Sequence, residues 1–189
     1  MKKDISLRLI RISTTWVSII GFCIFLTFSI LFLPGQTELT KNYSAGSGSP
    51  DTSLFYTPAA LYRMAEIYGI EGRAAYVQAR WTFDLAFPVI YTFFLITSIS
   101  WTAQRVLKPD HFLRRGNILP LYACLFDLLE NTCTTVVFVR YPAYLSFVSM
   151  LAPFITLMKW ICVGSSFTLL IGLSIAYLVK TIHSKRQQP

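Results

Sequence analysis

Two acidic residues lie near the middle of an apolar run in the second half of the chain. Asp127 and Glu130 stand three positions apart within roughly residues 118–139, where most other side chains are apolar. A carboxylate at the centre of a membrane-spanning helix costs about 2.5–3.5 kcal/mol on insertion scales. Because residues three and four apart share a helix face, Asn131 and Thr134 extend the pair into one polar stripe. We expect this stripe to face a bundle interior or a wet cavity.

Two acids this close repel each other, so one of them could hold a proton near neutral pH. Such a pair suits a proton carrier, a cation ligand or acid–base chemistry. The alternative is a hydrogen-bonded network between helices that only fixes their packing. Asp127 and Glu130 favour a site, because two acids are more than packing requires.

Charged residues on two other segments are candidate partners for these acids. Arg73, Arg80 and Asp84 fall on one face of a predicted helix, and Arg80 and Asp84 are close enough to pair. The alternative for Arg80 is an ordinary interfacial ion pair in which its side chain snorkels toward water. Lys159, near the outer end of the last apolar run, either snorkels as well or points inward and neutralises an acid. The candidate ligand-binding residues are Arg73, Arg80, Asp84, Asp127, Glu130, Asn131 and Lys159.

The elements that must position these residues are long apolar helices. The sequence is 54% hydrophobic and 14% charged, whereas soluble domains are about 25% charged. Several apolar runs reach the roughly 20 residues that a bilayer core requires. We predict an all-α integral membrane protein, a four-transmembrane-helix bundle forming a single membrane domain over residues 1–189. The predicted spans are about 12–33, 81–103, 118–139 and 153–179.

A long loop, about residues 35–75, separates the first two spans. Pro34–Gly35 is expected to end the first run, which is too long for a cleaved signal peptide. The Gly- and Ser-rich stretch that follows predicts a flexible segment. Thr57 is a suitable N-cap for a helix starting at Pro58, and Gly69 is a suitable C-cap. We expect this short helix to be extracytoplasmic.

Basic residues predict how the chain is oriented. They gather in the N-terminal tail, in the link between spans two and three, and in the C-terminal tail: Lys2, Lys3, Arg8, Arg11; Arg105, Lys108, Arg114, Arg115; Lys180, Lys185, Arg186. Because positive residues accumulate on the cytoplasmic side, we predict a multi-pass protein of the cell membrane with both termini cytoplasmic. The formal net charge of +8 therefore indicates topology and lipid contact, and no nucleic-acid partner is expected.

Cofactor and metal chemistry find little support in the sequence. The four cysteines form no CxxC pair, and the two histidines lie away from them, so no zinc site or other metal is expected. No cofactor is expected, and the motifs of common hydrolases and nucleotide-binding proteins are absent.

The leading hypothesis is an acid-lined polar pocket in the outer half of the bundle that binds a lipid headgroup, a cation or a small polar ligand. One alternative is a membrane-embedded enzyme that acts on lipid-type substrates through Asp127 and Glu130; the balance leans against an enzyme. Another is a structural or assembly protein whose polar residues only fix helix packing. Membrane lipid is an expected partner. A stripe of small residues suits a homo-oligomer or a membrane-protein partner: Gly164, Thr168, Gly172 and Ala176.

Overall fold

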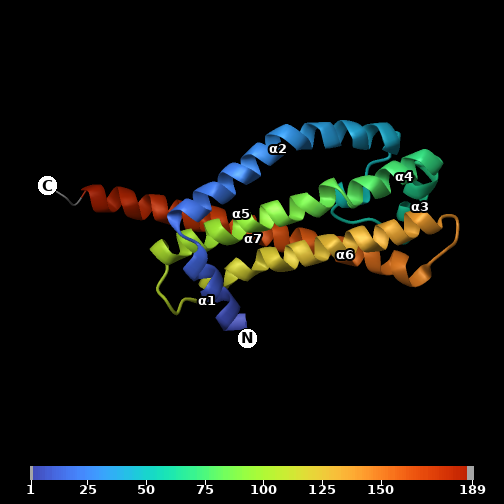
Figure 1. The fold of residues 1–189 in the computed structure, drawn as a ribbon. Coiled ribbons are helices and arrows are strands. Elements are labelled where there is room, and N and C mark those ends of the chain that lie inside the picture. Colours follow the sequence, from blue (N-terminus) through green and yellow to red (C-terminus); the bar gives the residue numbers. More distant parts are fainter. Residues whose placement is uncertain (1, 187–189) are drawn as a thin grey trace. The chain divides into compact units, whose positions relative to one another are not determined.

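The computed structural model describes the backbone of residues 2–186 and the side chains of residues 5–184. Over this range the chain is mainly helical and has no β-strand. The elements in chain order are α1 Lys2–Ile12, α2 Thr15–Ser44, the 3-10 helix η1 Pro50–Thr52, α3 Pro58–Ile67, α4 Gly69–Arg80, α5 Phe83–Val106, the 3-10 helix η2 Phe112–Ile118, α6 Leu119–Arg140 and α7 Ser146–Arg186 (Figure 1).

Four helical stretches within the described residues are long and apolar enough to cross a membrane. They are Thr15–Ser44, Gly69–Val106, Phe112–Arg140 and Ser146–Ser184, which confirms the predicted number of long apolar helices. In the second and third stretches 44% and 39% of the most apolar window is buried, against 11% in each of the other two. The two stretches that carry Asp84, Asp127 and Glu130 are therefore the most enclosed.

Helix α2 continues past Pro34, where we expected the first apolar run to end. Proline removes one backbone donor from a helix, but the ladder can continue when nearby carbonyls find other partners. Pro34 removes the backbone donor of the Ile30 carbonyl only, and around the proline the Thr37 hydroxyl donates to the Leu33 carbonyl at 3.0 Å. The helix ends only at Ser44, where Ala45 and then Gly46 adopt left-handed φ angles of 47° and 77°. The expectation of a polar loop from residue 35 was therefore wrong for residues 35–44.

Helix α3 begins as its capping residues predict. Pro58 is its first residue, and the Thr57 side chain accepts a hydrogen bond from the Ala60 amide at 3.1 Å. The helix ends at Ile67, and Gly69 then takes a φ of 63°, a conformation that glycine adopts without strain. The chain turns there directly into α4.

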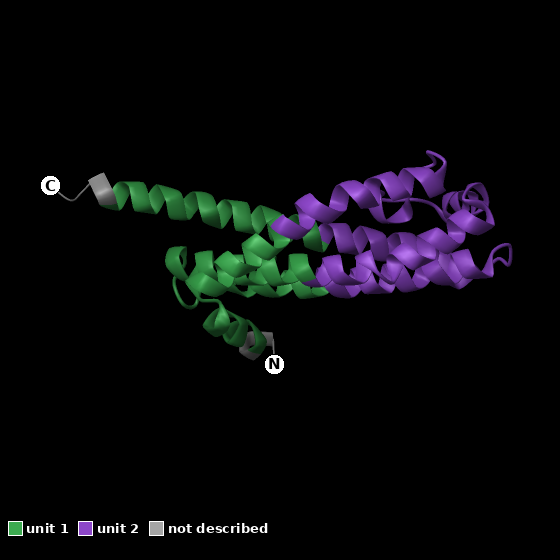
Figure 2. Ribbon diagram, turned by 45° about the horizontal axis from the view of Figure 1, so that its top comes forward, with its two compact units in different colours: residues 1–26, 90–122, 162–189 green, residues 27–89, 123–161 purple. Residues whose placement is uncertain are grey.

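The chain divides into two compact units (Figure 2). Unit 1 contains residues 1–26, 90–122 and 162–189, and unit 2 contains residues 27–89 and 123–161. Each unit thus collects segments that are far apart in the sequence, and each is described by itself below.

Unit 2 has an aromatic core. The buried residues that form it are Tyr56, Leu61, Ala65, Tyr68, Tyr76, Val137, Phe138 and Ala152. The rings of Tyr76 and Phe138 stack with their centroids 4.3 Å apart. The core brings α3 and α4 against α6, and this contact fixes the end of α4 that carries Arg80.

Unit 1 is held partly by buried polar contacts. Ser6 on α1 donates to the Asn117 side chain at 2.7 Å, and the Asn117 amide donates to Ser100 Oγ at 2.9 Å. On α7, an added Cβ at Gly164 or Gly172 would meet no atom within 4 Å. The small-residue stripe is therefore open at its glycines, and partner binding through it stays a prediction.

Candidate functional site

Six charged side chains gather within unit 2, and we call them the charged cluster. Four are carboxylates and two are basic groups: Asp51 on η1, Arg80 at the end of α4, Asp84 in the first turn of α5, Asp127 and Glu130 on α6, and Lys159 on α7. Arg80 is 3% exposed, Lys159 4% and Glu130 0%. These three members of the cluster are therefore enclosed by protein.

Arg80 joins two of the carboxylates. Its Nη1 lies 3.1 Å from Asp51 Oδ2, and its Nη2 lies 2.5 Å from Asp84 Oδ2. The guanidinium also stands over the Tyr76 ring, 4.7 Å from the centroid. Because its charged head is held on these sides by protein groups, Arg80 does not snorkel toward water.

Lys159 joins the other two carboxylates to the same network. Its ammonium forms an ion pair with Glu130 Oε2 and lies 4.0 Å from Asp127 Oδ1. It also donates to the Asp51 backbone carbonyl at 3.1 Å. Of the two orientations that the sequence left open for Lys159, the structure has the inward one.

The polar face of α6 is buried, as its spacing indicated. Glu130, Asn131 and Thr134 are each at most 1% exposed. The Glu130 Oε1 atom accepts a hydrogen bond from the Thr156 hydroxyl at 2.6 Å, and that hydroxyl lies 3.1 Å from the Tyr56 hydroxyl. Asn131 donates from its amide to the Asp84 backbone carbonyl at 3.0 Å. These bonds tie α6 to α7 and α5.

Asp51 was not among the candidate residues, because it follows a Gly- and Ser-rich stretch that predicts a flexible loop. In the structure that loop is anchored. Lys159 binds the Asp51 carbonyl, Trp160 donates to the Ser53 carbonyl at 3.0 Å, and the Tyr68 hydroxyl donates to the Gly48 carbonyl at 2.6 Å. An acid directly after Pro50 was the available sequence signal, but without its distant partners it resembles any loop acid.

The environment of Asp51 favours its charged form. Burial alone raises the pKa of a carboxyl group, but the charges of Arg80 and then Lys159, with a hydrogen bond from Ser49, outweigh burial and lower the pKa of Asp51 below its ordinary value of 3.8. At Tyr56 burial raises the pKa, and the nearby Glu130 charge raises it further. The site therefore holds an ionised loop carboxylate and a neutral phenol.

Arg73 is the candidate residue that makes its contacts elsewhere. Its Nη1 donates to the Ala65 carbonyl at 2.8 Å, and its guanidinium stands over the Tyr141 ring at 4.6 Å. It thus fastens α3 and the turn after α6 to α4. The remaining predicted site residues, Arg80, Asp84, Asp127, Glu130, Asn131 and Lys159, come together.

Four polar atoms of these residues are buried without a hydrogen-bond partner. Asp84 Oδ2 and Glu130 Oε2 form ion pairs instead, whereas Arg80 Nε and Asn131 Oδ1 have neither kind of contact. Unsatisfied buried polar atoms are uncommon, and they often mark a place where water or a ligand binds. Among residues 5–184 no group of three or more His, Cys, Asp or Glu is arranged to hold a metal ion.

Comparisons with protein-family models, with curated proteins and with solved structures find no match for this chain.

Proposed function

We propose that this is a multi-pass membrane protein that binds a cation at the charged cluster. One observation carries the proposal: four carboxylates share two basic groups. Negative charge without a counter-charge is costly in apolar surroundings, and binding of a positive ligand relieves the cost. Of the ligand classes left open by the sequence, a cation agrees with this charge balance better than an anionic headgroup does.

The side-chain exposures suggest where the cation contacts the protein. Glu130 is fully buried and already bound by Lys159, but the side chains of Asp51, Asp84 and Asp127 are 18%, 14% and 14% exposed. These three carboxylates are reachable from outside the cluster. Because no three acidic side chains among residues 5–184 are arranged as ligands of one metal ion, the cation would contact these carboxylates singly or in pairs, while Arg80 and Lys159 keep the carboxylates from repelling one another.

The membrane orientation belongs to the same proposal. Eleven of the seventeen Lys and Arg residues lie in the segments of unit 1, which hold only two of the nine Asp and Glu residues. By the positive-inside rule, the protein lies in the cell membrane with both termini and the segment between α5 and α6 on the cytoplasmic side.

Reporter fusions test this orientation. A fluorescent protein after residue 189 should fluoresce, and alkaline phosphatase fused after residue 50 should be active; the reverse pattern would refute the orientation.

Cation binding is tested by thermal unfolding of the purified full chain in mild detergent. Chloride salts of sodium, potassium, magnesium, calcium and ammonium are compared at equal ionic strength. A cation present at 100 times its dissociation constant stabilises the folded state by about 2.7 kcal/mol. At least one salt should therefore raise the unfolding midpoint specifically, and Asp127→Asn should weaken that shift.

Glu66→Gln is the matched control. It makes the same chemical change at an exposed acid of unit 2 that lies outside the cluster, so the salt-specific shift should persist. If the midpoint of the unaltered protein is the same in all five salts, the cation proposal is wrong.

A fastening role is the second candidate, because the charged groups bind one another and the loop directly. In that case Asp127→Asn and Glu130→Gln change the stability of the protein, whereas the identity of the salt has no effect in any variant.

A further inference from the structure

The C-terminal end of α5, in unit 1, gathers basic side chains. Arg105 Nη1 donates to the Trp101 carbonyl at 2.9 Å, and Lys180 Nζ donates to the Arg105 carbonyl at 2.8 Å. From the link that follows the helix, Arg114 Nη2 donates to the Leu107 carbonyl at 2.8 Å. Because a helix C-terminus carries only about half a negative charge, three basic groups leave this end of α5 positive.

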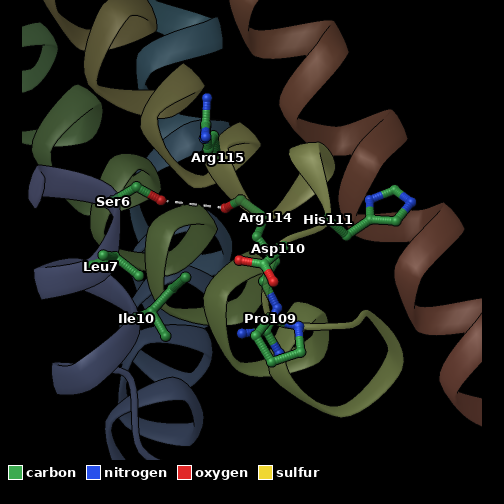
Figure 3. A pocket seen from close by; sticks show the side chains of 8 residues that line it. All are labelled: Ser6, Leu7, Ile10, Pro109, Asp110, His111, Arg114 and Arg115. Atoms are coloured by element: carbon green, nitrogen blue, oxygen red, sulfur yellow. Dashed lines mark hydrogen bonds between the residues drawn. The ribbon is translucent and has the colours of Figure 1, made fainter. Parts of the chain in front are cut away.

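Arg114 has an acid near it, whereas the other two basic groups do not pair with one. It lines a pocket together with Asp110, and Figure 3 shows Arg115 pointing away from both. Among residues 5–184, Arg105 and Lys180 form no ion pair with a carboxylate. We call Arg105 and Lys180 the basic pair, and the unbalanced positive charge lies on them.

Aromatic side chains and a hydroxyl fix the position of Arg105. Its guanidinium stands 3.7 Å from the centroid of the Trp101 ring, and the Tyr177 ring meets Trp101 edge-on at 5.4 Å. Thr15 Oγ1, at the start of α2, accepts from Arg105 Nη2 at 3.1 Å and from Trp101 Nε1 at 3.0 Å. Lys180 lies three positions after Tyr177 on the same face of α7. The site is therefore built from three helices of one unit.

The basic pair keeps donors that a ligand can reach. Arginine has five N–H donors and lysine three, and the contacts above use two and one of them. Arg105 is half-buried and Lys180 is exposed, and the unbonded Arg105 Nε is not buried. The ammonium lies against the backbone of the residue that carries the guanidinium, so one headgroup can contact both. Arginine and lysine both bind phosphate.

Apolar side chains near the basic pair are exposed. Trp16, which follows Thr15, is 73% exposed, and Ile175 and Leu178 of α7 are 56% and 59% exposed. Tryptophan is enriched at the level of lipid headgroups, with apolar residues on its bilayer side. A lipid whose headgroup contacts the basic pair therefore has apolar protein surface beside its acyl chains.

We propose that Arg105 and Lys180 bind the headgroup of an anionic phospholipid, one whose phosphate is its only charge. A zwitterionic headgroup would bring its own positive charge to two basic groups that pair with no carboxylate. The ligand is a lipid because the chain lies in a membrane, so this inference rests on the membrane part of the proposed function. It is independent of the charged cluster, which lies in the other unit.

Native mass spectrometry of the purified full chain in detergent tests the proposal. Phosphatidylglycerol and phosphatidylcholine with identical short acyl chains are offered at equal concentration, and the retained lipid is counted. One basic side chain beside an anionic lipid strengthens binding about fivefold, so the basic pair should favour phosphatidylglycerol about 25-fold. Glycerol phosphate, offered alone, has the phosphate without the acyl chains and should not be retained.

Two variants and a control test the residues. Lys180→Gln and Arg105→Gln should each lower the ratio of phosphatidylglycerol to phosphatidylcholine about fivefold. Lys180→Gln is the decisive variant, because Lys180 is exposed, whereas Arg105 also binds α2. Arg115→Gln is the matched control. It removes the same charge from an exposed arginine of the same unit outside the basic pair, so the ratio should persist.

Three results would overturn the proposal: equal retention of the two lipids, retention of glycerol phosphate as strong as that of phosphatidylglycerol, or equal effects of Arg115→Gln and Lys180→Gln. The last would mean that the net charge of the surface attracts the lipid. A reversed reporter pattern refutes the membrane orientation, whereas loss of the lipid preference with the expected reporter pattern refutes this site alone. Asp127→Asn should leave the lipid preference unchanged, and Lys180→Gln should leave the salt-specific thermal shift unchanged.

Discussion

Removing a base from the charged cluster should cost more stability than removing an acid. Lys159→Met takes away the counter-charge of Glu130 and Asp127, and Glu130→Gln takes away one of the surplus negative charges. At the 4.0 Å separation of Lys159 Nζ and Asp127 Oδ1, the attraction is about 4 kcal/mol with an effective dielectric constant of about 20. Removing one partner of a buried ion pair typically costs about 3–5 kcal/mol.

We therefore expect Lys159→Met to lower the free energy of unfolding by about 3–5 kcal/mol. Glu130→Gln should cost less, about 1–2 kcal/mol, because the amide keeps an acceptor for the Thr156 hydroxyl and the net charge of the cluster falls. Lys159 also keeps Asp127 and the Asp51 carbonyl as partners in that variant.

Reversible unfolding by sodium dodecyl sulfate in mild-detergent micelles, followed by circular dichroism, gives both free energies on one scale. Lys41→Met is the control, since Lys41 is exposed and pairs only at the surface with Glu38, and it should be close to neutral. If Glu130→Gln proves as costly as Lys159→Met, the four acids do not carry surplus charge and the basis of the cation proposal fails.

Three further predictions concern elements around the site. Asp51 has a lowered pKa in the folded state, so its contribution to stability is present above its ordinary value of 3.8 and is lost as the pH falls through the lowered pKa; Asp51→Asn should flatten the dependence of unfolding free energy on pH in that range. Thr57→Ala removes the N-cap of α3 and should cost about 1 kcal/mol in the same unfolding assay. Gly72→Ala should destabilise by about 1–3 kcal/mol, because the new Cβ would lie 2.7 Å from the Tyr43 backbone carbonyl. Gly35→Ala is its control, since that Cβ meets no atom within 4 Å, and it should stabilise α2 by up to about 1 kcal/mol.

The parts of the site that the sequence predicted depend on local regularities. Asp127, Glu130, Asn131 and Thr134 share one helix face in an otherwise apolar run. Exposing that face to lipid would cost free energy, so helix geometry predicted that Glu130 and Asn131 are buried against other helices. Lys159 could be recognised as a partner because a lone base in an apolar run needs a counter-charge. The number of long apolar helices followed in the same way from the lengths of the runs.

The parts that were missed depend on distant contacts. The bond from Lys159 to the Asp51 carbonyl spans 108 positions of sequence, and no local pattern encodes it. The composition of the loop predicted a flexible segment, and Gly46 and Gly48 do have left-handed φ angles. It gave no indication that aromatic and basic donors on other helices bind the carbonyls of this loop. Helical spacing alone assigned Arg73 to the site. In the structure its guanidinium instead contacts the Ala65 carbonyl and the Tyr141 ring, and these contacts depend on the turn between α3 and α4.

The ion pair between Lys159 and Glu130 has a consequence for how the protein is made. The stretch that contains α6 has the lowest mean hydropathy of the four long apolar stretches, and it carries two acids, while their base lies on α7, the next helix to be synthesised. A nascent α6 alone would enter a bilayer with both acids lacking that base. Biogenesis should therefore delay release of α6 from the insertion machinery until α7 arrives, so that the two helices partition together as a hairpin. A chain truncated before α7 should leave α6 outside the lipid.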